Sequence, residues 1–503
     1  MTSFSNRLAP LFTRYPHVNA LVLGHLAAYG MGPFYAWPVM AICLSAFWLN
    51  FTRLATKKSW QSWANGFLFG FGFFVSSLWW IGNALLVGGN DFKWAYPLAV
   101  CGLPILFALY PMLACGLTRM ICKGRSLGAY SLFVVLMFAA EWARGTLLTG
   151  FPWNLTGMAW TNTLAVLQFL SVGGIYGLTA LSLFLFTAAG FVIKGAEPKF
   201  LRIGTGVIAL LIGVGLYIYG RERLETHPTT YNPDVVVQII QPNIKQEDKW
   251  DPDKKWDNTR ATLQLIEPIN LWKTAKTRVV VIPETALTYH DFQTPEVVDA
   301  LKGRVSSYTE HTTYLLSGAL LHDDVGYHNS LVVMDNHITP LDSFDKFHLV
   351  PFGEYIPFQR YIPIGPITRF AGFVEGSGPR TLSQPDLPAF SPLVCYEVIF
   401  PGHVVNKTDP RPEWMVNVTN DAWYGISAGP FQHLAHARYR AIEEGLPMVR
   451  AANTGISAVI DPYGRMIVAT GLFQDSNPET LLPSPAPETL YARFNSKRVT
   501  SSR

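Results

Sequence analysis

The stretch DVVVQIIQPN, residues 234–243, marks the point at which the chain changes character. Before it lie long runs without a charged side chain, which are typical of membrane-spanning helices. From this stretch onward, short runs rich in β-branched residues alternate with segments of helical pattern, and this alternation predicts an α/β domain. We therefore expect a transmembrane domain at residues 1–225 and a separate α/β domain at residues 230–472.

Length and composition agree with a chain of two parts. The 503 residues are too many for one ordinary core. Hydrophobic residues make up 49% of the chain against 15% charged, and the mean hydropathy of +0.20 is high for a soluble protein. The formal charge of +4 is too small to indicate nucleic-acid binding. The five cysteines form no CxxC pair and no metal-ligand spacing, so we expect no metal site.

The uncharged runs of the first half define the predicted transmembrane domain. A helix needs roughly 20 apolar residues to cross a bilayer. Seven runs are suitable, at residues 17–33, 35–52, 62–84, 94–118, 127–146, 168–193 and 203–220. Lys and Arg gather at the N-terminus and after the second, fourth and sixth runs, which places these loops on the cytoplasmic side. The seventh span then delivers the α/β domain to the outer side of the membrane.

Three side chains of the second half lie beside apolar runs in a way that indicates chemistry. Glu284 ends the run VVVIPE, Lys346 lies in a stretch rich in aromatic residues and proline, and Cys395 lies within PLVCYEVIFP. A carboxylate beside a thiol can act as a general base, and a fixed ammonium can stabilise an oxyanion. Each residue also has a structural interpretation, as an ion-pair partner, a lysine with a buried stem, or a packed thiol.

The order Glu284, Lys346, Cys395 resembles that of the nitrilase superfamily. The surrounding sequence is similar to the apolipoprotein N-acyltransferases, a membrane-embedded branch of that superfamily. The matching stretches are IPETAL, KFHLVPFGEYIPF, VCYEVIFP, NVTNDAWYG, GPFQHLAHARYRAIEEGLPMVRAANTGISAVIDPYGR and, in the membrane half, EWARGTLLTGFPWNLTG. The resemblance spans nearly the whole chain. It implies a polytopic α-helical membrane domain joined to an α/β domain with the nitrilase-like αββα sandwich.

The resemblance implies a two-step acyl transfer without a cofactor. Glu284 takes the proton of Cys395, whose thiolate attacks the ester carbonyl of a membrane phospholipid, while Lys346 stabilises the oxyanion. The thioester then passes its acyl chain to the N-terminal amine of the diacylglyceryl-cysteine of an apolipoprotein, which is the last step of lipoprotein maturation. The resemblance also implies a multi-pass protein of the bacterial inner membrane, with the catalytic domain on the periplasmic side.

Four supporting positions follow from the same resemblance. Glu354 matches a second acid of the active site that positions the catalytic lysine. Tyr396 and Glu397 follow the nucleophile as the family pattern requires. Trp250 matches a tryptophan on a loop near the lipid, although a purely packing role for this aromatic side chain remains open.

Two further segments carry expectations of their own. The stretch 344–373 is apolar and aromatic, and we expect it to form a membrane-facing lid. The tail at residues 473–503 contains no apolar run where the family normally has its last transmembrane helix. We expect this tail to be irregular and to lack that helix.

Other functions remain open on the residues alone. A membrane-tethered nitrilase-type amidase would use water as its second nucleophile, and the long matching stretch of the membrane half argues against it. A transporter or receptor would only bind a ligand, and the spans show neither paired intramembrane charges nor an inverted repeat. An inactive homologue is the third alternative. The sequence leaves acyl-chain and headgroup preference undecided.

Overall fold

The structure, a computed structural model, divides into two compact units. It describes residues 15–54, 58–88, 92–266, 275–305, 312–356 and 372–500. The first unit comprises Met1–Gly82 and Trp94–Glu225, and the second comprises Asn83–Lys93 and Thr226–Arg503. The short segment Asn83–Lys93 therefore belongs with the second unit although it lies within the membrane half of the sequence. It is attached there by Asn83, whose Nδ2 donates to the Tyr424 carbonyl at 2.8 Å.

The first unit is helical, and a helix overlaps each of the seven predicted runs. The helices are α2 (Pro16–Ala27), α3 (Trp37–Arg53), α4 (Trp60–Leu78), α5 (Leu103–Ile121), α6 (Leu127–Thr146), α8 (Leu170–Lys194) and α9 (Lys199–Thr226). Among the described residues, five helical segments are long and apolar enough to cross a membrane. The segments are Trp60–Leu86, Lys93–Ile121, Leu127–Thr146, Leu170–Lys194 and Lys199–Thr226.

Helices α2 and α3 are shorter than the runs that predicted them. Helix α2 has 12 residues and ends at Ala27, well before the end of the uncharged run. The sequence YGMGPF follows, and Pro33 cannot continue a helix because it lacks the backbone N–H.

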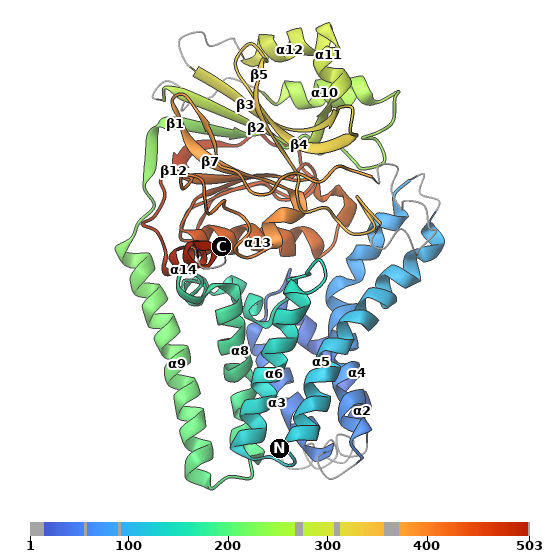
Figure 1. The fold of residues 1–503 in the computed structure, drawn as a ribbon, viewed down its shortest axis with the longest axis vertical. Helices are drawn as coiled ribbons and strands as arrows, with labels where there is room; N and C mark the ends of the chain where they lie inside the picture. The colour runs from blue at the N-terminus through green and yellow to red at the C-terminus, as the bar shows by residue number, and fades with distance from the viewer. Residues whose placement is uncertain are drawn as a thin grey trace. The chain divides into compact units, whose positions relative to one another are not determined.

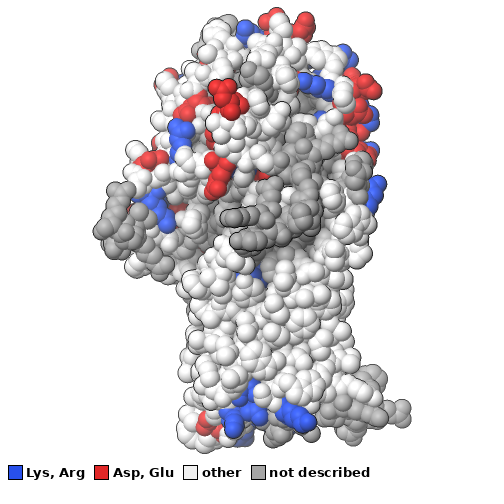
Figure 2. Space-filling model, turned by 45° about the vertical axis from the view of Figure 1, so that its right-hand side comes forward, with Lys and Arg blue, Asp and Glu red and all other residues white. Residues whose placement is uncertain are grey.

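Figure 2 shows that the visible face of this unit is almost free of charged side chains, with Lys and Arg gathered at one end.

Glycines bring helices of the first unit into backbone contact. A Cβ on Gly24 of α2 would lie 2.0 Å from the Phe69 carbonyl oxygen of α4. On the facing side, a Cβ on Gly72 would lie 2.3 Å from the Leu21 carbonyl oxygen. Small residues at such crossings are the usual device for close helix packing in a membrane, where the hydrophobic effect does not drive helices together.

The second unit contains two six-stranded sheets. The first sheet has the order β12 (Glu479–Pro483), β1 (Tyr231–Ile239), β2 (Thr277–Thr288), β3 (Thr312–His322), β4 (Tyr327–Met334) and β5 (Pro340–Asp345). The second has the order β11 (Met466–Ala469), β10 (Ala458–Ile460), β9 (Met448–Ala451), β8 (Trp414–Val418), β7 (Leu387–Val394) and β6 (Leu382–Gln384). Strands β1, β2 and β3 run parallel, as do β7, β8 and β9.

The two sheets pack face to face, with β2 against β8 and β9 and with β4 against β7. Figure 1 shows helices on both outer faces. Helices α10 (Lys255–Gln264), α11 (Tyr289–Gln293) and α12 (Pro295–Val305) cover the first sheet, and α13 (Gly429–Glu444) and α14 (Leu490–Thr500) cover the second. Strand β2 is apolar on both faces because it lies between a helix layer and the other sheet. The predicted fold class, a helical membrane domain followed by an αββα sandwich, is confirmed.

The expectation of an irregular tail is wrong. Residues 479–483 form β12, which pairs antiparallel with β1 at the edge of the first sheet, and 490–500 form α14, which contacts α13. The tail reads as irregular because a five-residue edge strand between prolines has too little pattern to be recognised. Half of the predicted lid, residues 357–371 of 344–373, lies outside the described residues.

Candidate active site

The structure brings the three predicted residues together between the two sheets. Glu284 lies within β2, Lys346 directly follows β5, and Cys395 follows β7 as the first residue of the short helix η8 (Cys395–Ile399). The first two therefore come from one sheet and the cysteine from the other. All three are buried, with exposed fractions of 6%, 1% and 8% in that order.

A break in the pairing of β2 with β3 places Glu284. The four residues 283–286 of β2 lie opposite the single residue Gly318 of β3. A Cβ on Gly318 would lie 2.4 Å from the Glu284 Cα, so only glycine leaves room for the bulged backbone. The next residue, Thr285, has a left-handed φ of +47°. Bulges of this kind re-aim a side chain beside a functional site, and here the side chain is a carboxylate.

Three groups fix the Glu284 carboxylate. Its Oε1 accepts a hydrogen bond from Asn329 Nδ2 at 2.7 Å, and its Oε2 accepts one from the backbone N–H of Asn420 at 2.8 Å. The ammonium of Lys346 lies 3.8 Å from Oε1. Sequence reasoning missed Asn329. Asn329 stands between His328 and Ser330, and nothing in this polar stretch distinguishes it or reveals its partner.

Glu354 lies beside the catalytic-lysine candidate. Its Oε1 is 2.8 Å from Lys346 Nζ and also accepts from Asn329 Nδ2 at 3.0 Å. Burial alone disfavours an ammonium, but the charges of Glu354 and Glu284 outweigh burial and raise the pKa of Lys346 above its usual value. Lys346 is therefore a fixed cation, held by one carboxylate and facing another.

Glu397 links the backbone just before Cys395 to the backbone that follows Lys346. Its carboxylate accepts backbone N–H bonds from Val394 and Phe347, each at 2.7 Å, and from His348 at 3.2 Å. Burial raises the pKa of Glu397 to about 8, although these N–H groups and Lys346 act in the opposite direction. Tyr396 is buried next to it, with its ring packed edge-on against Phe400.

Burial favours the neutral thiol of Cys395 over the thiolate. Burial raises its pKa well above the usual value and Glu284 adds to the effect, while Lys346 and a hydrogen bond with Thr419 act against it. Cys395 also has a left-handed φ of +53°, which is a strained conformation for a residue with a side chain. A base must therefore take the proton before the sulfur can attack, and Glu284 is the buried carboxylate next to it.

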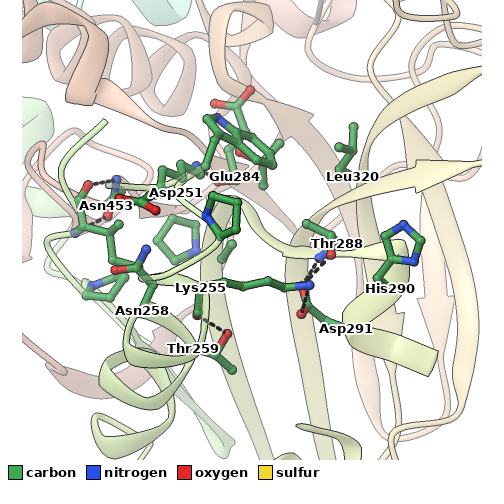
Figure 3. A pocket seen from close by; sticks show the side chains of 18 of the residues that line it. Asp251, Lys255, Asn258, Thr259, Glu284, Thr288, His290, Asp291, Leu320 and Asn453 are labelled. Carbon is green, nitrogen blue, oxygen red and sulfur yellow. Dashed lines mark hydrogen bonds and ion pairs between the residues drawn. The ribbon is translucent and has the colours of Figure 1, made fainter. Parts of the chain in front are cut away.

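A cavity of about 500 Å³ opens beside Glu284. Figure 3 shows Asp251, Lys255 and Asp291 around it, with Lys255 paired to Asp291 at 3.0 Å. Trp250 also lines this cavity, so the structure places it next to the site rather than in the core. Neighbouring Lys249 donates from Nζ to the Glu284 carbonyl oxygen at 2.8 Å.

Two comparisons place this chain among known proteins. The family model described as "Apolipoprotein N-acyltransferase N-terminal domain" matches residues 23–188, and that described as "Carbon-nitrogen hydrolase" matches residues 236–503. A protein of Rhodopseudomonas palustris named apolipoprotein N-acyltransferase is 39% identical, over 95% of this chain and 91% of that protein. Proteins of the same name from Bradyrhizobium diazoefficiens and Brucella melitensis are 36% and 37% identical, over 94% of this chain in both cases and 90% and 85% of theirs.

Proposed function

The chain belongs to the apolipoprotein N-acyltransferase family, and from this premise we propose that it transfers an acyl chain from a membrane phospholipid to the N-terminal amine of a diacylated apolipoprotein. The acyl chain passes through a thioester on Cys395. The observation that carries this proposal is the convergence of Glu284 and Lys346, from one sheet, on a buried and strained cysteine of the other. These residues have the separate roles of base, oxyanion partner and nucleophile.

The first half-reaction forms the thioester. Glu284 takes the Sγ proton, and the thiolate attacks the carbonyl carbon of the phospholipid ester. The developing oxyanion is stabilised by the Lys346 ammonium, which Glu354 holds in place at 2.8 Å. As the intermediate collapses, Glu284 returns the proton to the leaving oxygen, so that a lysophospholipid departs.

The second half-reaction forms the amide. The uncharged α-amine of the apolipoprotein cysteine attacks the thioester carbonyl, and Glu284 accepts the amine proton. Collapse of the second tetrahedral intermediate breaks the carbon–sulfur bond, and the proton passes from Glu284 to Cys395. A thioester is a better acyl donor to an amine than an oxygen ester, which is the advantage of dividing the transfer into two steps.

The membrane helices support a lipid substrate and suggest where the chemistry takes place. Both substrates carry acyl chains, and the five membrane-competent helices of the described chain keep the enzyme at the bilayer. The distribution of Lys and Arg along the first half supports a multi-pass protein of the inner membrane whose catalytic domain is periplasmic. The mixed polar cavity lined by Trp250 is a candidate site for the polar part of one substrate.

The test uses the full chain, a phospholipid labelled in its acyl chain, and a diacylated lipopeptide. Incubation with the phospholipid alone is expected to label the protein through a hydroxylamine-sensitive bond. Addition of the lipopeptide is expected to move the label to an amide. Cys395→Ala is expected to abolish labelling, whereas Cys43→Ala, at a buried cysteine of the helical unit, leaves it intact.

Each alternative gives a different result in this experiment. Label that appears on the protein but is released as free fatty acid, without amide, indicates an amidase that uses water. Absence of any labelled protein refutes the thioester mechanism and favours a binding protein or an inactive homologue. Labelling that persists in Cys395→Ala contradicts the assignment of the nucleophile.

A further inference from the structure

The backbone carbonyl of Cys395 is held by two buried side chains. Asn417 Nδ2, from β8, lies 3.3 Å from this carbonyl oxygen, and His433 Nε2, from α13, also lies 3.3 Å from it. Both residues have no exposed surface. The carbonyl belongs to the residue whose φ is +53°, so the two contacts fall on the strained part of the backbone.

The proton arrangement of this contact follows from its chemistry. A carbonyl oxygen only accepts hydrogen bonds, so this contact is a hydrogen bond when Nε2 carries a proton. The other ring nitrogen, Nδ1, lies 2.8 Å from Asp421 Oδ1 and 3.0 Å from a terminal nitrogen of Arg450. The charged ring donates from both nitrogens, to Cys395 and to Asp421. The neutral ring donates to Cys395 in the tautomer with its proton on Nε2, and Nδ1 then accepts from Arg450. Burial, together with Arg450, lowers the pKa of His433, which favours the neutral ring.

Arg450 orients both donors. One terminal nitrogen lies 2.8 Å from Asp421 Oδ2, and the other donates to Asn417 Oδ1. Because the amide oxygen of Asn417 accepts from the guanidinium, its NH₂ group must face the opposite way, towards Cys395. Asp421 lies against His433 in the same network. These residues are completely buried and linked to one another, and such a network fixes one geometry because each broken bond leaves a polar group without compensation.

We propose that His433 and Asn417 are positioning residues of the acyl transfer, which hold the Cys395 carbonyl and thereby keep the nucleophile in its left-handed conformation with its thiol directed at Glu284. Asp421 and Arg450 orient these two donors. The inference rests on the proposed role of Cys395 as nucleophile.

A strained backbone persists only where its surroundings over-determine it. Without the two donors, the Cys395 backbone is free to relax towards the extended region that ordinary residues prefer. The relaxation rotates the Cα–Cβ bond and moves the sulfur away from its base. The expected defect is therefore in the chemical step, while the phospholipid still binds, because neither donor lines the cavity.

The experiment compares three variants of the full-length enzyme. His433→Met removes the donor at similar volume, and His433→Gln restores an N–H near the position of Nε2. His436→Met is the matched control, since His436 is equally buried on the same helix and packs against Tyr439. The rate of thioester formation from labelled phospholipid is measured over a range of substrate concentrations, alongside the melting temperature.

We expect His433→Met to lower kcat by roughly 100-fold with KM unchanged, and His433→Gln to recover all but about tenfold of it. His436→Met is expected to stay within about twofold of the wild-type rate even if its melting temperature falls. Equal losses in His433→Met and His436→Met, or a lack of recovery in His433→Gln, overturn the proposal. If His433→Met does not fold, Asn417→Asp serves instead, because it keeps the acceptor for Arg450 and removes the donor to Cys395.

A structure of His433→Met, or of Asn417→Asp if His433→Met does not fold, provides a second measurement, independent of activity. The φ of Cys395 is expected to leave the left-handed region, and a φ that stays near +53° refutes the positioning role. If the wild-type enzyme forms no thioester, the proposed function fails, and this backbone comparison still decides whether the two donors hold the cysteine.

Discussion

Replacement of Gly318 by alanine tests whether the bulge in β2 sets the position of the general-base candidate. The added Cβ would lie 2.4 Å from the Glu284 Cα and 2.5 Å from the Pro283 carbonyl oxygen. Both of these atoms belong to the backbone, so neither can move aside by a side-chain rotation. Gly318→Ala is therefore expected to push this part of β2 out of place.

The size of the displacement follows from the distances. Ordinary contact of a Cβ begins at 3.4 Å, so the β2 backbone at Glu284 must move by about 1 Å. Overpacking of a well-packed interior costs about 1–3 kcal/mol. A misplacement of about 1 Å in a catalytic group lowers the rate by roughly 100-fold. A loss of about 1–3 kcal/mol leaves most of the protein folded. The rate is therefore expected to fall much more than the folded fraction does.

The assay measures thioester formation and thermal unfolding in the same preparations. Gly303→Ala is the matched control, because Gly303 lies in helix α12 and a Cβ there meets nothing within 4 Å. In a helix this change is expected to stabilise the fold by about 0.5–1 kcal/mol and to leave the rate unchanged. A Gly318→Ala enzyme with wild-type rate and melting temperature would refute the reasoning.

Three further predictions concern the groups around the site. Glu397→Gln brings an NH₂ group against backbone N–H donors and is expected to destabilise the fold by about 1–3 kcal/mol, and unchanged thermal unfolding contradicts this. Asn329→Asp places a third carboxylate between Glu284 and Glu354. The rate is expected to fall. It is expected to recover partly as the pH is lowered, because repulsion among the three carboxylates raises the pKa of one of them, which then takes up a proton. A pH–rate profile parallel to that of the wild type contradicts this prediction. Burial lowers the pKa of Lys249 from 10.5 to about 8. Between these two pH values the folded state therefore binds fewer protons at Lys249 than the unfolded state does. The stability of the wild type relative to Lys249→Met is therefore expected to rise between pH 8 and 10.5, and a constant difference in unfolding free energy excludes the shift.

The sequence alone identified the residues that end strong patterns. Glu284 and Cys395 stand within or after continuous apolar runs, and such runs are visible without knowledge of which strands pair. Lys346 stood out by the aromatic stretch around it. Glu354 and Glu397 came only through resemblance to a family, because nothing in their immediate context reveals the backbone groups they hold.

Asn329 and His433 could not be found in this way. The role of Asn329 depends on the antiparallel register of β3 with β4, which sets it beside the bulge of a third strand. The role of His433 depends on the packing of α13 against η8, the short helix that begins with Cys395. The sequence around a polar residue gives no sign of its hydrogen-bond partner, because the partner comes from another strand or helix of the folded domain.

The pairing of β12 with β1 also sets the order in which the catalytic unit can be built during synthesis. Strand β1 is the first strand of the unit to leave the ribosome, and its outer neighbour β12 is the last. Until then β1 presents a bare edge, which is prone to pair with other chains. Such distant pairings form slowly. The membrane helices precede both strands in the chain, so the nascent enzyme reaches the bilayer before β12 can pair with β1. The unpaired edge of β1 is therefore held at the membrane and is not free in solution.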